Sequence, residues 1–149
     1  MKTDEKFDVQ SISRDKVLLI LKWCENKFGK STHYKRFPKL RVYRSKGTAN
    51  PDYRDTGLLG EFHNETIKIF LGSHTSVKQL CRTVIHEYKH YLMGLKEFYQ
   101  LYGKFVKKGK NLDYIEDHHP HEIKAERFEK RWTDLCFKEL KNKLYGKQG

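Results

Sequence analysis

The chain has few cysteines and no long apolar run, and each shortage excludes a class of protein. Three cysteines in 149 residues, widely spaced and odd in number, do not form a disulfide framework, so we expect a cytoplasmic protein. No apolar run approaches the roughly 18–20 residues of a membrane span, so no membrane association is expected. The first ten residues contain acidic side chains and no apolar core, so we expect no secretory signal.

Aromatic and basic residues are plentiful by contrast. Aromatics make up 13% of the chain, which argues against disorder. The length favours one domain over residues 1–149, with residues 1–12 as a flexible tail. The 31 Lys and Arg against 19 Asp and Glu give a net charge of +12, which raises the question whether the basic surface binds nucleic acid or an acidic partner weakly. No known nucleic-acid fold signature accompanies that charge.

Apolar periodicity and capping residues predict the secondary structure. Ser13 and Ser76 are candidate N-caps, and Gly29 and Gly94 are candidate helix stops. The predicted helices are 14–28, 77–93, 95–106 (interrupted at Gly103) and 120–144, the predicted strands are 40–43, 58–62 and 66–71, and 107–119 is predicted to be a loop. Because the strands are grouped early, the order indicates an α+β domain with a small sheet of two to four strands.

The strongest functional signal is an H-E-x-x-H pattern at residues 86–90. Positions i and i+4 of a helix share a face, so His86 and His90 can bind one metal ion. Glu87 is rotated by about 100° and can reach a water on the metal rather than the metal. Apolar residues form a separate stripe that can face a core. We therefore expect a zinc site with Glu87 as the general base.

A catalytic zinc site needs a third protein ligand and an open fourth position. An E-x-x-A-E-x-F pattern begins the final helix, with Glu122 and Glu126 one turn apart. One carboxylate can bind metal while the other accepts the N–H of a ligating histidine. His118 or His119 could instead complete a three-histidine site, although the helical context favours Glu122.

The two motifs, some thirty residues apart, resemble those of the gluzincin metallopeptidases. The pattern looks most like the minigluzincins and the ImmA/IrrE-type peptidase domain. The resemblance implies a small zincin-like domain with an active-site helix and a glutamate helix. It also implies that His86, His90 and Glu122 are zinc ligands and that Glu87 is the general base. Glu126 would match the acid that steadies a ligand histidine.

The resemblance covers about residues 66–132 and leaves two features open. The edge strand that holds substrate in the family would be 58–62 or 40–43. A transition-state stabiliser has candidates near the glutamate helix, which are Tyr114, His118, His119 and His121, with Tyr114 and His119 preferred.

These observations predict a zinc-dependent metalloendopeptidase that hydrolyses a protein or peptide substrate. The alternative is a nucleic-acid-associated or protein-binding module on a zincin scaffold, with structural or vestigial zinc. Glu87 separates the two, since a structural site needs no base. A third hypothesis is a DNA-linked protease similar to the SprT-like group, in which both properties hold.

Overall fold

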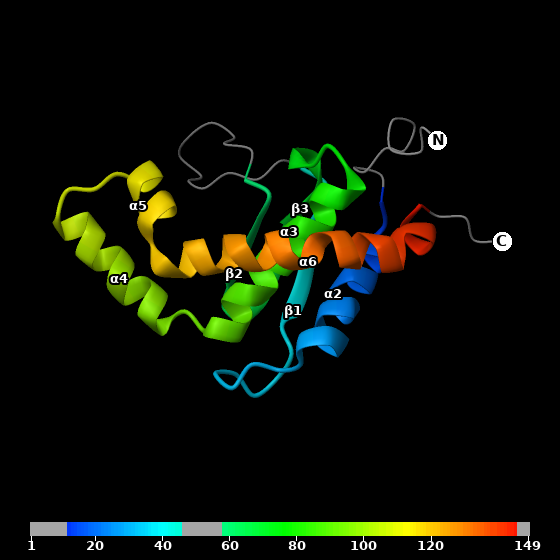
Figure 1. Cartoon of the computed structure of the whole chain (residues 1–149), viewed down its shortest axis with the longest axis horizontal. Helices are drawn as coiled ribbons and strands as arrows, with labels where there is room; N and C mark the ends of the chain where they lie inside the picture. The colour runs from blue at the N-terminus through cyan, green and yellow to red at the C-terminus, as the bar shows by residue number, and fades with distance from the viewer. Residues whose placement is uncertain (1–11, 46–57, 146–149) are drawn as a thin grey trace.

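The computed structural model describes residues 12–45 and 58–145, which form an α+β fold and confirm the predicted class (Figure 1). The described residues contain five α-helices and a three-stranded mixed sheet. The elements are α2 (Arg14–Phe28), β1 (Lys39–Tyr43), β2 (Gly60–His63), β3 (Thr66–Phe70), the 3-10 turn η2 (Leu71–Ser73), α3 (Val77–Met93), α4 (Lys96–Lys107), α5 (Leu112–His118) and α6 (Pro120–Leu144).

Helices α2, α3 and α6 have the predicted bounds, but two other predictions are wrong. The predicted loop over 107–119 contains α5, whose first turn is capped by the Asn111 side chain accepting from Tyr114 N at 2.9 Å. Helix α4 continues through Gly103 without interruption. The predicted tail falls mainly on residues 1–11, outside the described residues, whereas Ile12 is buried in the core.

Helix α3 is the central element of the fold. It packs against β2 and β3 on one side and against α2 and α6 on the other, and α6 crosses it in Figure 1. Its apolar stripe supplies the core, including the fully buried Leu80, Val84, Ile85 and Tyr88. Burial on several sides fixes the direction of the remaining stripe, which carries the H-E-x-x-H motif.

The sheet has the order β1-β3-β2, so β1 and β2 are both edge strands. β1 pairs parallel to β3 with Leu40 opposite Ile67, and β2 pairs antiparallel to β3 with Phe62 opposite Ile67. The β2–β3 turn places Asn64 and Glu65 at φ 52° and 59°. Two successive positive φ angles are typical of a type I′ turn, whose twist matches that of a hairpin.

A glycine allows β2 to lie directly against α3. A Cβ on Gly60 would be 2.7 Å from Thr83 Cγ2, 3.0 Å from Lys68 O and 3.4 Å from Glu87 Cγ. Those distances leave no room for a methyl group unless the strand or the helix moves.

We expect Gly60→Ala to destabilise the fold by about 1–3 kcal/mol, because the methyl group overpacks the β2–α3 contact. Thermal or urea denaturation measures the effect. Gly103→Ala is the matched control, since a Cβ there meets nothing within 4 Å and alanine favours a helix by about 0.5–1 kcal/mol. Equal stability of Gly60→Ala and the native chain would contradict the close approach.

Three thiols from three helices lie in the core. Cys24, Cys81 and Cys136 are free and buried.

No described helix is both long enough and apolar enough to cross a membrane.

Candidate metal centre

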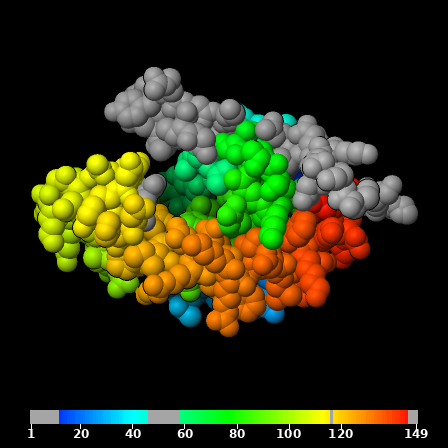
Figure 2. All heavy atoms as spheres, turned by 45° about the horizontal axis from the view of Figure 1, so that its top comes forward, coloured from blue at the N-terminus to red at the C-terminus, as the bar shows by residue number. Residues whose placement is uncertain are grey.

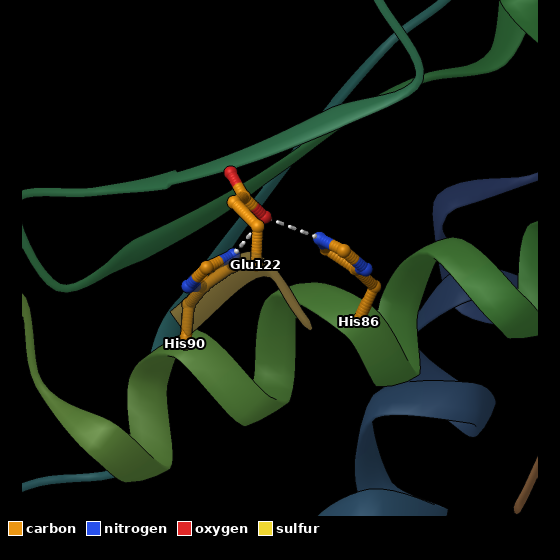
Figure 3. A group of neighbouring side chains, drawn as sticks. All are labelled: His86, His90 and Glu122. Carbon is orange, nitrogen blue, oxygen red and sulfur yellow. Dashed lines mark hydrogen bonds and ion pairs between the residues drawn. The ribbon is translucent and has the colours of Figure 1, made fainter. Parts of the chain in front are cut away.

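The structure brings together the three predicted metal ligands. Helix α3 directs His86 and His90 to the same side, and the first turn of α6 places Glu122 over both rings (Figure 3). Glu122 Oε1 lies 3.2 Å from His86 Nε2 and 3.0 Å from His90 Nε2. Two imidazole nitrogens thus converge on one carboxylate oxygen.

The spacing of these donor atoms fits a tetrahedral metal ion. Bonds of about 2.0–2.1 Å to a tetrahedral zinc place ligand atoms about 3.3 Å apart. The two histidine–glutamate distances are close to that value, and all three donor atoms lie within 4.8 Å of one another. Two imidazoles and one carboxylate are also a donor set of catalytic zinc sites, where a fourth position stays open.

A carboxylate that the sequence reading missed supports one ligand. Glu129 Oε1 lies 2.6 Å from His86 Nδ1, and Glu129 Oε2 lies 3.6 Å from Arg82 Nε. Glu126, expected in this role, is exposed and lies 3.8 Å from Lys130 instead. The signal that could have found Glu129 is its position two turns after Glu122, on the same face of α6.

We expect Glu129→Gln to weaken zinc affinity about 10–100-fold, because the carboxylate orients His86 and raises its basicity. Competition with a fluorescent chelator measures the dissociation constant. Glu126→Gln is the matched control on the same helix and should change the affinity less than about twofold, as exposed pairs contribute little. A larger loss in Glu126→Gln than in Glu129→Gln would restore the original assignment.

Glu87 occupies a buried position beside the ligands. Its side chain is only 8% exposed, and within the described ranges it has no hydrogen-bond or ion-pair partner. Burial raises the pKa of Glu87, while His86 and His90 oppose the rise. A carboxylate with a raised pKa and free oxygen atoms is suited to accept and return a proton.

A cavity of about 670 Å³ connects these groups. His86, Glu87, His90 and Glu122 all line it, together with residues of β2, α4 and α5. In Figure 2 a recess opens between α3 and the α5 region, above the start of α6. The open side of the metal ligands therefore faces a space large enough for a peptide segment.

The structure does not place the proposed stabilisers at this cavity. His119 is fully buried, with Nε2 2.9 Å from Phe98 O and Nδ1 accepting from His121 N at 3.1 Å. Nδ1 thus caps the start of α6, and Nε2 donates to the Phe98 carbonyl on α4. Tyr114 stacks on His118 with ring centroids 3.9 Å apart, also away from the cavity.

Two phenol groups line the cavity instead. Tyr99 and Tyr102, on α4, belong to its wall. Neither is among the predicted site residues, because nothing in the sequence pattern indicates that α4 turns this face toward the metal ligands.

The two candidate edge strands differ in their relation to the site. Gly60, Glu61 and Phe62 of β2 line the cavity, whereas no residue of β1 does. β2 is therefore the edge beside the metal ligands, and it lies against α3 close to Glu87.

The ligand cluster is electrostatically coupled. Burial would lower the pKa of His86, but hydrogen bonds to Glu122 and Glu129 outweigh it and raise the pKa to about 10. Burial would raise the pKa of Glu122, but hydrogen bonds to His86 and His90 hold it well below its ordinary value. In the metal-free chain the cluster is thus a charged imidazolium–carboxylate network.

We expect the stability of the metal-free chain to decrease as pH rises from about 6.5 to 10. His86 has its raised pKa only when folded, so its contribution is complete below its ordinary pKa of 6.5 and lost through about 10. Glu122 contributes above its ordinary 4.5 and loses that contribution as pH falls. Thermal denaturation in EDTA should therefore show the full contribution of both groups between about pH 4.5 and 6.5. A Glu122→Gln variant that kept the native profile would contradict the assignment.

Comparison with known proteins gives no relative. No protein-family model, no curated protein and no solved structure matches this chain.

Proposed function

We propose that this chain is a zinc-dependent metallopeptidase. The observation that carries the proposal is the convergence of His86, His90 and Glu122 on one point, with the buried Glu87 beside them in a cavity. A structural metal site is closed and needs no acid–base group. Here Glu87, which has no partner among the described residues, shares an open cavity with the ligand set, and this favours catalysis.

The residues divide the chemistry between them. His86, His90 and Glu122 would hold the ion, and Glu129 would orient the first of these ligands. When bound, zinc supplies Lewis-acid polarisation of a carbonyl and lowers the pKa of a coordinated water to about 7. Glu87 accepts the water proton at a carboxylate oxygen and returns it to the departing amine nitrogen.

We propose that an extended substrate segment lies along β2. Within the described part of the chain one edge of that strand has no partner strand, and its residues 60–62 line the cavity. An extended peptide can bond to such an edge through its own backbone, which aligns a scissile bond without requiring a particular side chain.

The purified chain provides the test. We expect about one zinc per chain by elemental analysis, as three convergent ligands define one site. We expect cleavage of casein or a mixed peptide pool that EDTA abolishes and stoichiometric zinc restores. A fully zinc-loaded chain that cleaves no peptide in the pool would refute the proposal.

A second candidate, binding of nucleic acid or an acidic partner, is favoured by one feature. Lys27 and Arg131 lie over the Trp132 ring, and Lys89 lies over Phe128. Cations beside aromatic rings suit phosphate contact. Steep salt-dependent DNA or RNA binding without any cleavage would favour this candidate over the peptidase.

We propose a reducing compartment, such as the cytoplasm, as the place of action. The three cysteines are free and buried, which fits a chain that does not depend on disulfides.

A further inference from the structure

The cavity differs in charge from the molecule as a whole. The chain carries a net charge of +12. Five carboxylates nevertheless line the cavity, and among the described residues no Lys or Arg does. A bound Zn²⁺ would offset the charges of Glu87 and Glu122. Three carboxylates, on Glu61, Asp117 and Glu126, remain without a metal to neutralise them.

These three carboxylates come from different elements around the cavity. Glu61 is on β2, Asp117 on α5 and Glu126 on α6. Within residues 12–45 and 58–145, Glu61 and Asp117 have no ion pair, although Lys68 is the cross-strand neighbour of Glu61. Among the residues that the structure describes, the ion-pair partner of Glu126 is the exposed Lys130, at 3.8 Å. Such exposed pairs are weak, so little protein charge neutralises this group.

The wall beside these carboxylates is aromatic. Phe98, Tyr99 and Tyr102 of α4 line the cavity, and Tyr99 is 51% exposed. Burial and the charge of Glu61, which lines the same cavity, raise the pKa of Tyr99. Aromatic faces bind the stems of Lys and Arg and attract their charged groups.

A second, independent observation indicates that the cavity takes a ligand. Glu87 is more than nine-tenths buried, lines the cavity, and has no hydrogen-bond partner among the described residues. A buried carboxylate without a partner is unfavourable unless something enters to bond with it. The acidic groups therefore line a cavity in which a bound ligand would be favoured.

We propose that the cavity selects peptide segments that carry an arginine or lysine side chain next to the scissile bond. The inference rests on the proposed peptidase function, because it assigns the specificity of that same site. The cationic group contacts Asp117, Glu126 and Glu61, and its aliphatic stem packs on the α4 wall. More distant cations on the surface oppose this only weakly, since physiological salt screens charges beyond about 8 Å.

A paired peptide library tests the proposal by binding as well as by turnover. Each peptide has arginine or its uncharged isostere citrulline at a fixed central position and random residues elsewhere. Immobilised, zinc-loaded Glu87→Gln protein captures peptides without cleaving them, and mass spectrometry measures the recovery. We expect arginine peptides to be enriched about tenfold, as expected of a charge-assisted hydrogen bond. Wild-type hydrolysis of the same library should show the same preference.

Charge-neutral variants assign the effect to the cavity. In the Glu87→Gln background, Asp117→Asn and Glu126→Gln should each reduce the enrichment at least about threefold. Asp113→Asn is the matched control, since it removes the same charge one turn earlier on α5 and lies outside the cavity. It should leave the enrichment unchanged.

The outcomes separate this inference from the proposed function. Equal recovery of arginine and citrulline peptides overturns the inference, while zinc-dependent hydrolysis without preference leaves the peptidase intact. A preference that Asp113→Asn removes and Asp117→Asn does not also overturns it. Enrichment that depends on Asp117, in a zinc-loaded chain that hydrolyses nothing, supports the charge selection and refutes the peptidase.

Discussion

Replacing Glu87 with glutamine should abolish hydrolysis and leave zinc binding intact. The amide keeps the shape of the side chain but cannot accept the water proton, and loss of a general base lowers the rate about 10²–10⁴-fold. Because Glu87 is not among the three converging ligands, the zinc stoichiometry should not change. Steady-state kinetics on a cleavable peptide, together with elemental analysis, measures both effects.

The same variant has a stability readout that excludes unfolding as the cause. Burial raises the pKa of Glu87, so its ionisation at neutral pH disfavours the folded state. The metal-free Glu87→Gln chain should therefore be at least as stable as the native chain at pH 7. Asp113→Asn, outside the cavity, should keep full activity. Native activity in Glu87→Gln would eliminate the base and favour a structural role for the metal.

Truncating Glu122 to alanine should produce the largest loss of zinc. This residue supplies the only ligand from α6, and its carboxylate contacts both histidines. Its removal leaves two imidazoles on one helix, so zinc affinity should fall by more than the about 10–100-fold expected for a supporting carboxylate such as Glu129. Competition with a chelator of known affinity gives the dissociation constant.

Glu126→Ala is the matched control, because it makes the same truncation one turn further along α6. It should retain stoichiometric zinc. If Glu122→Ala also retained tight, stoichiometric zinc, the ligand assignment would be wrong and another side chain would have to complete the site.

The part of the site on α3 could be predicted because it depends on local periodicity. The spacing of His86 and His90 sets their common face, and the apolar stripe with Tyr88 determines which side of the helix is buried. The same reasoning gave the bounds of α2, α3 and α6. The Ser76 side chain accepts a backbone N–H at the start of α3, whereas Ser13 stands at the N-cap position of α2 without a side-chain cap bond.

The rest of the site depends on how the helices cross, which periodicity does not encode. Glu126 and Glu129 both follow Glu122 at spacings that share a helical face, and only the packing of α6 across α3 decides that Glu129 meets His86. His119 has the chemistry of a stabiliser, but its bond to the Phe98 carbonyl depends on how α4 packs against the junction of α5 and α6. Which of these side chains contacts the metal ligands thus depends on tertiary packing.

The position of the ligands along the chain has a consequence for the wall of the cavity. Glu122 follows His90 by 32 positions, and α4 and α5 lie between them. α4 has no fully buried residue, and it contacts the rest of the site through Phe98, which stacks on His119 and meets the ring of His90. A bound ion would cross-link α3 to α6 and so close the segment that contains α4 and α5. A cross-link that closes a long segment restricts the chain most. A bound metal would then hold the α4 wall of the cavity in place as well as supply the chemistry.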